Sequence, residues 1–124
     1  MFLLIFRAYL ELLRLESALA RHDFAEIYRR VKSSKATAAV PVRSSEGKII
    51  RAAELACVLY FKEVLCLQRS AATTCLLRSH GLNASMVIGV QQIPFRAHAW
   101  VELQGRCVSD KSYIPEAYLV LDRC

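Results

Sequence analysis

Residues 66–70 read CLQRS, and residues 94–102 read PFRAHAWVE. The first segment places Cys66 near the start of an expected helix, and the second places His98 on an expected strand. A cysteine and a histidine that a fold brings together can act as a nucleophile and its base. These two segments therefore direct both the fold prediction and the search for a site.

The first helix is expected over residues 1–21. Its charged residues recur at helical spacing, which leaves an apolar face made of Phe2, Leu3, Phe6, Leu10 and Leu13. We expect this face to pack on the protein's own core, with docking to a partner or lying on a membrane as the alternatives. The apolar start is too short to span a bilayer and lacks the basic region of a signal peptide, so we expect it to stay on the protein.

Three further helices are expected before residue 81. Asp23 and Glu26 resemble a capping box, whereas residues 33–45 are small and polar and indicate a loop. Gly81 can take the left-handed conformation that ends a helix. The helices are expected over residues 23–32, from a serine cap at 44 or 45 to residue 59, and over 64–80. We expect the third to be central because it is apolar on most sides.

Strands follow the helices. Residues 91–96 contain Pro94 and are expected to connect the first two strands. Helices followed by an antiparallel sheet predict an α+β fold in a single domain, with a helical part over residues 1–45 and a catalytic core over 46–124. The strands are expected at residues 84–90, 97–103, 106–110 and 118–121.

The turn at residues 104–105 decides what faces His98. On the strand, His98 and Glu102 share a face because side chains alternate. A two-residue loop would place Asp110 on the wrong face, whereas a three-residue loop pairs Glu102 with Arg106 and His98 with Asp110. We predict the three-residue loop because it pairs opposite charges and gives the histidine a carboxylate neighbour.

Cys66, His98 and Asp110 are the candidate catalytic residues. The unpaired N–H groups and the dipole at a helix start favour a thiolate, and a carboxylate holds an imidazole in one orientation. The alternatives are structural: a small core cysteine, a hydrogen-bonded core histidine and an aspartate that begins a turn. For the remaining cysteines we expect only core packing, and these are Cys57, Cys75, Cys107 and Cys124.

Composition narrows the class of partner. The 124 residues are 55% hydrophobic and carry a net charge of +6, but the basic residues are mostly scattered, so we do not expect nucleic-acid binding. The five cysteines contain no C-x-x-C pair and do not cluster with the three histidines. Neither a disulfide framework nor a zinc site is therefore expected, and a reducing, cytoplasmic location fits.

The two opening segments, together with residues 76–90 between them, resemble the transglutaminase-like leader peptidases of lasso-peptide biosynthesis. Their order and spacing match over roughly residues 48–110. The resemblance implies a papain- or transglutaminase-like fold, with N-terminal helices packed on a small antiparallel sheet. It also implies a Cys-His-Asp triad of Cys66, His98 and Asp110, which needs no metal or cofactor.

The resemblance further implies a task and partners. The enzyme would cut the leader from a ribosomally made precursor peptide, and an ATP-dependent cyclase would then join the freed α-amine to an Asp or Glu side chain. A separate leader-recognition protein is expected, with this chain as the stand-alone peptidase of a split system. Membrane association is not expected. The alternatives are an acyltransferase of the transglutaminase type and a non-catalytic peptide-binding module with the same fold.

Overall fold

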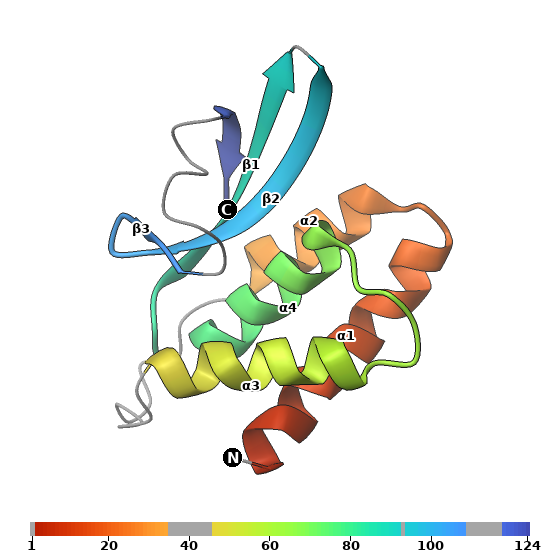
Figure 1. Ribbon diagram of the computed structural model, residues 1–124, viewed down its shortest axis with the longest axis vertical. Helices are drawn as coiled ribbons and strands as arrows, with labels where there is room; N and C mark the ends of the chain where they lie inside the picture. Colours follow the sequence, from red (N-terminus) through yellow and green to blue (C-terminus); the bar gives the residue numbers. More distant parts are fainter. Residues whose placement is uncertain (1, 35–45, 93, 109–117) are drawn as a thin grey trace.

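Four helices precede a four-stranded antiparallel sheet in the computed structural model, which describes residues 2–34, 46–92, 94–108 and 118–124 (Figure 1). This arrangement confirms the predicted α+β fold with N-terminal helices packed on a small sheet. The helices are α1 (Phe2–Ala20), α2 (Phe24–Ser33), α3 (Glu46–Leu59) and α4 (Cys66–Ser79). The strands are β1 (Ala84–Gln92), β2 (Phe95–Leu103), β3 (Arg106–Cys107) and β4 (Leu119–Arg123).

Helix α4 is the central helix. It packs against α1, α2 and α3 as well as β1 and β2, and ten of its fourteen residues are buried. Figure 1 shows it between the other helices and the strands. The prediction that the third helix is central is wrong, because Val58 and Leu59 of α3 are exposed. The apolar sequence of α3 therefore covers one side of the core instead of filling its middle.

The helix ends follow the sequence. The Asp23 carboxylate accepts a hydrogen bond from the Glu26 backbone N–H at 3.2 Å, which confirms the predicted cap of α2. Gly81 takes a positive φ of 82°, and the Leu82 N–H donates to the Leu77 carbonyl at 3.0 Å. This pattern satisfies carbonyl groups at the end of α4. The serine cap expected at residue 44 or 45 lies outside the described residues.

Helix α1 buries the face opposite to the one predicted. The face that contains Phe2, Phe6 and Leu10 is exposed, so the expectation that it packs on the core is wrong. Both faces are apolar in sequence, and the narrower side chains on the other face allow α3 and α4 to approach closely. The core face consists of Ala8, Leu12, Leu15 and Ala18. Within the described ranges, no helix is long and apolar enough to cross a membrane.

The sheet order is β3-β2-β1-β4. Strands β1 and β2 form a long hairpin that pairs continuously from Ala84 with Leu103 to Gln92 with Phe95. The expectation of a connection over residues 91–96 is therefore wrong. Pro94 stands before the first residue of β2, where its missing N–H does not interrupt the ladder.

The β2–β3 turn has the register that the sequence analysis rejected. Leu103 pairs with Arg106, so the loop contains only Gln104 and Gly105. Both take a positive φ, 54° and 76°, as in the type I′ turn, which matches the twist of paired strands. The predicted pairing of Glu102 with Arg106 is wrong, because Cys107 lies opposite Glu102.

Charge pairing does not favour the predicted register either. The Arg106 guanidinium lies 2.7 Å from the Glu46 carboxylate at the start of α3, so the ion pair that favoured the three-residue loop is made elsewhere. Asp110, the predicted partner of His98, lies outside the described residues. The two-residue turn does not support that pair.

Gly89 on β1 gives a direct test of packing on the face of the sheet that carries Trp100. A Cβ at this position would lie 2.7 Å from Cη2 of Trp100 and 3.0 Å from Cβ of Tyr118. We expect Gly89→Ala to lower the free energy of unfolding by about 1–3 kcal/mol through overpacking. Urea denaturation measures this change.

Gly105→Asn is the matched control for that variant. A Cβ at Gly105 meets no atom within 4 Å, and asparagine tolerates a positive φ better than other non-glycine residues. The control should lose less stability than Gly89→Ala. Equal losses in the two variants would contradict the packing assigned to Trp100.

Candidate active site

Cys66 is the first residue of α4. Leu65 stands before it in an extended conformation and makes no side-chain cap, and the Arg69 N–H donates to the Leu65 carbonyl at 3.0 Å. The first backbone N–H groups of a helix have no partner within the helix. Cys66 is half-buried and carries a free thiol, so it occupies the helix-start position that the sequence predicted.

Ser70 connects α4 to the edge of β2. It lies one turn after Cys66, on the same side of the helix, and its buried hydroxyl donates to the Ala99 carbonyl at 3.0 Å. The Val101 carbonyl accepts from the Val108 N–H on the β3 side. Since alternate residues of a strand direct their carbonyls to the same side, Ala99 presents its carbonyl at that same edge.

Two hydrogen bonds define the direction in which α4 runs. Ser70 contacts Ala99, and eight residues later Nε of Arg78 donates to Ala84, the strand partner of Leu103. Eight helical residues span about 12 Å, and the four strand residues from Ala99 to Leu103 span about 13 Å. Helix α4 therefore runs alongside β2 in the same direction. Its first residue, about 6 Å before Ser70, lies toward the His98 end of the strand.

His98 lies on the sheet face opposite the one that α4 covers. It is half-buried and pairs with Gly89 across the hairpin. Its ring stacks on Trp100 with centroids 6.1 Å apart and lies 5.6 Å from the ring centroid of Tyr118. His98 and Glu102 share a face, as predicted, and Trp100 lies between them with its indole N–H donating to Glu102 at 3.0 Å. This aromatic cluster limits the positions that the imidazole can take.

The first turn of α4 is also fixed on the helix side. Gln68 is fully buried, and its Nε2 donates to the Leu12 carbonyl of α1 at 3.0 Å, so it is an anchor and not an oxyanion donor. The Tyr60 hydroxyl beside it donates to Glu16 at 2.7 Å. Burial alone would raise the pKa of Glu16, but its hydrogen bonds with Lys62 and Tyr60 lower that pKa below the ordinary value.

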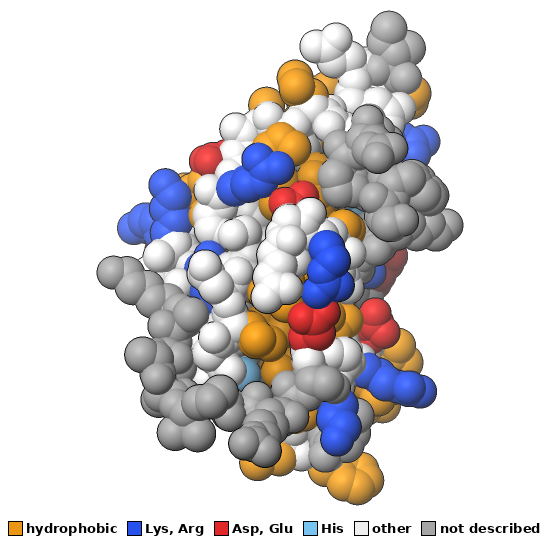
Figure 2. Space-filling view, turned by 90° about the vertical axis from the view of Figure 1, so that its left-hand side faces the viewer, with side chains coloured by type: hydrophobic (Ala, Val, Ile, Leu, Met, Phe, Trp, Pro, Cys, Tyr) orange, Lys and Arg blue, Asp and Glu red, His pale blue; other side chains and the backbone are white. Residues whose placement is uncertain are grey.

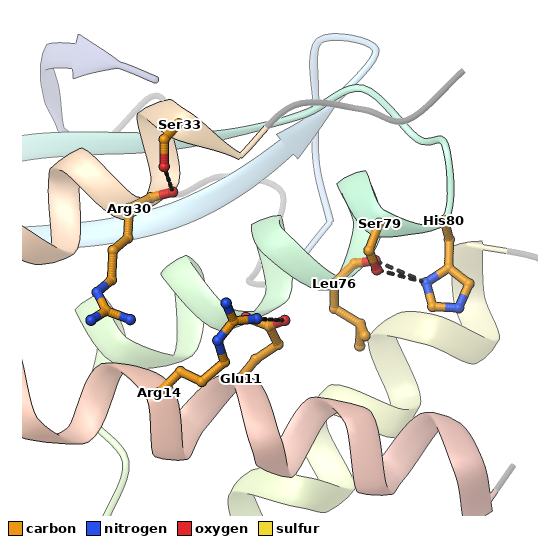
Figure 3. A network of polar contacts seen from close by, with 7 residues as sticks. All are labelled: Glu11, Arg14, Arg30, Ser33, Leu76, Ser79 and His80. Carbon is orange, nitrogen blue, oxygen red and sulfur yellow. Dashed lines mark hydrogen bonds and ion pairs between the residues drawn. The ribbon is translucent and has the colours of Figure 1, made fainter. Parts of the chain in front are cut away.

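The last turn of α4 has its own anchor. The Ser79 hydroxyl donates to the Leu76 carbonyl at 2.7 Å, and Nδ1 of His80 lies 2.9 Å from the same oxygen (Figure 3). His80 stands directly after the last residue of α4. Because it is buried beside a backbone carbonyl, it acts as a cap for α4.

An apolar hollow opens beside the residue that precedes Cys66. Its volume is about 410 Å³, and it lies between the end of α1, the start of α2 and the segment before α4. Leu65 forms the wall nearest to Cys66 along the chain, and Lys62 and Glu63 supply polar atoms at its rim. A hollow of this kind can hold an apolar side chain of a bound peptide. The remaining lining residues are Leu19, Ala20, His22 and Phe24.

The structure thus places the start of α4 toward the end of β2 that carries His98, with the helix and the histidine on opposite faces of the sheet, while Asp110 lies outside the described residues. Ser70 belongs to the first quoted segment but has no predicted role. A small hydroxyl four residues after a candidate nucleophile, in a buried helix, is the signal that could have identified it. Gly89 in a strand could likewise have indicated the close approach of Trp100.

Ser70→Ala tests whether this edge contact holds α4 in place. It removes the donor and leaves the Ala99 carbonyl without it, so we expect the free energy of unfolding to fall by about 1–3 kcal/mol. Ser33→Ala is the control, because its exposed hydroxyl also donates to a helix carbonyl, that of Arg30 at 3.0 Å. Chemical denaturation of both variants compares them, and equal effects would argue against the anchor.

Comparison with known proteins agrees with this architecture. A 45-residue stretch is 42% identical to the microcin J25-processing protein McjB of Escherichia coli, which covers 36% of this chain and 22% of that protein. No solved structure matches the chain. The Transglutaminase-like superfamily matches residues 9–122, nearly the whole sequence. With a half-buried cysteine at the start of the central helix and a histidine on the neighbouring strand, the chain belongs to the transglutaminase-like superfamily.

Proposed function

We propose that this protein is a cysteine peptidase that removes the leader from a lasso-peptide precursor. Cys66 is the nucleophile, His98 is the general base and acid, and Asp110 orients the imidazole. The observation that carries the proposal is Cys66 as the first residue of a buried helix that docks, through Ser70, beside the strand of His98. The assignment of Asp110 rests on the sequence resemblance.

The comparisons support this class of activity. The superfamily match covers most of the chain, and McjB is by its name a protein that processes microcin J25. The matched stretch is 22% of the length of McjB, so the precursor and partners of this chain are part of the proposal. The partners are the precursor peptide, a separate leader-recognition protein and the ATP-dependent lasso cyclase.

The acylation step begins with proton transfer. His98 takes the proton of the Cys66 thiol, and the sulfur attacks the carbonyl carbon at the junction of leader and core. The negative charge that develops on the carbonyl oxygen suits the unpaired N–H groups at the start of α4. The C–N bond then breaks, the amine of the core leaves with the proton from His98, and the leader remains on sulfur as a thioester.

Hydrolysis completes the cycle. Water gives a proton to His98, and its oxygen attacks the thioester carbon. The C–S bond then breaks, the proton of His98 returns to the sulfur to restore the thiol, and the leader leaves as a carboxylic acid that ionises in water. If an amine replaced water, the same thioester would give an amide, which is the acyltransferase alternative that the superfamily match also supports. The mass of the leader product separates the two reactions.

Alkylation of the cysteines tests the nucleophile without a substrate. Burial raises the pKa of the Cys57, Cys75 and Cys124 thiols, so little thiolate forms at neutral pH and their reaction with iodoacetamide should be slow. Cys66 should be labelled before these three cysteines in a peptide map. Labelling of Cys66 no faster than that of Cys57, which is also half-buried, would favour a non-catalytic binding module instead.

Cys66→Ala tests the activity directly. In a purified mixture with recognition protein and precursor, we expect leader removal to slow by on the order of a thousandfold or more, because the covalent step is lost. Cys57→Ala should keep the parent rate because it removes a thiol from the neighbouring helix α3. Mass spectrometry follows the products. Undiminished cleavage by Cys66→Ala would remove the proposal, and a leader with a new amide would convert it to acyl transfer.

A further inference from the structure

The exposed side of α1 carries a seven-residue repeat. Counting from Leu3 as the first position, positions one and four of each heptad form one line along the helix, which we call the heptad face. These are the positions through which a helix packs lengthwise on another helix. The heptad face consists of Leu3, Phe6, Leu10, Leu13, Ser17 and Ala20.

Every residue of the heptad face is exposed. Exposure is 60% at Phe6, 41% at Leu10 and 42% at Leu13, and reaches 70% at Leu3. The N-terminal end of α1 projects beyond α3 in Figure 1, and hydrophobic side chains gather at the same lower end of the molecule in Figure 2. Large apolar side chains aligned on one exposed face mark a site for a partner.

A row of positive charge borders this face. Arg7, Arg14 and Arg21 occupy the fifth position of successive heptads, and all three are exposed. Arg14 lies 3.5 Å from Glu11 on the same helix, as Figure 3 shows, but such an exposed pair holds its guanidinium only weakly. In paired helices this position faces the flanking charges of the partner and sets partner choice.

A second copy of the same helix does not fit this face. In an antiparallel pair, the three arginines of one copy would face those of the other. In a parallel pair they would face the seventh heptad position, which holds Phe2, Tyr9 and Glu16. Glu16 already accepts the Tyr60 hydroxyl and pairs with Lys62 at 2.6 Å. Neither arrangement supplies acidic partners for the arginine row.

The charge distribution also distinguishes a helix from a lipid surface. A helix that lies on a membrane carries basic residues across its polar face. In α1 the arginines border only one edge of the heptad face, and the other edge holds Tyr9 and Glu16. A one-sided edge matches a partner whose charge is also confined to one side.

We propose that the heptad face of α1 docks an amphipathic helix of another protein, with a leucine-like apolar stripe and an edge of Asp or Glu residues facing Arg7, Arg14 and Arg21. The apolar stripe covers Leu3, Phe6, Leu10 and Leu13, and the acidic edge pairs with the arginines. This interaction does not depend on the peptidase activity, because the four large apolar residues and the three arginines that make it are not part of the candidate site.

Two synthetic peptides of four heptads test the docking site. Both carry leucine at the first and fourth positions, and one has glutamate and the other lysine at the flanking positions. Fluorescence anisotropy with the full chain should show at least tenfold tighter binding of the acidic peptide. Phe6→Gln/Leu10→Gln should weaken that binding at least tenfold, and Arg7→Glu/Arg14→Glu should reverse the preference between peptides.

Lys48→Glu/Arg51→Glu is the matched control, since it makes the same change of charge at exposed positions of α3. It should leave the peptide preference unchanged. Equal binding of both peptides, or loss of preference in this control, would overturn the proposal. So would a dimer in light scattering that Phe6→Gln/Leu10→Gln dissociates, or binding to phosphatidylglycerol vesicles with no peptide binding. Unchanged thermal unfolding of the variants shows that they remain folded.

Discussion

Burial of α4 brings polar side chains into the core, and three of them form hydrogen bonds to other elements. Gln68 donates to α1, Ser70 to β2, and Arg78 to β1 and to the Val31 and Ser34 carbonyls at the end of α2, at 2.5 and 2.8 Å. An unmade bond of this kind costs about 1–3 kcal/mol. Because the acceptors lie on four different elements, only one position of the helix satisfies all of them. The position of Cys66 follows from that constraint.

This constraint affects the candidate site at the edge of β2. Helix α4 covers the face of Val101 and Leu103, whereas His98 lies on the other face with Trp100 and Tyr118. A helix packed over the middle of the sheet would be separated from that histidine by the strands. Because α4 contacts the sheet at its edge, through the Ala99 carbonyl, the start of the helix can approach His98.

The sequence predicted those features that depend on local chemistry. Asp23, Gly81 and the alternation around His98 each carry a signal that one segment decides alone. The register of the β2–β3 turn carries no such local signal, because the turn requires Gln104, a non-glycine residue, to adopt a positive φ. The buried face of α1 also could not be predicted from the sequence of that helix alone. Both of its faces are apolar, and the choice between them depends on how closely α3 and α4 can pack.

The candidate catalytic residues show the same division. Placing Cys66 at a helix start needed only the pattern of one helix, whereas the edge contact needed two segments 29 residues apart. Ser70 gave no sign of its partner, because a hydroxyl in an apolar helix can bond its own backbone as readily as another strand. The predicted pairing of His98 with Asp110 depends on a three-residue β2–β3 turn, whereas the turn has two residues. Contacts between distant segments were therefore the least predictable part of the site.

The Arg78 side chain has a consequence for any attempt to shorten the protein. Its guanidinium is bound by carbonyls 44 and 47 residues earlier in the chain, which belong to the helical part before residue 46. Truncation to residues 46–124 would keep Cys66 and His98 but remove those acceptors, as well as Leu12, which accepts from Gln68. It would also expose to water the apolar side of α4 that α1 and α2 cover. The first two helices therefore cannot be removed to give a minimal fragment that keeps the candidate site.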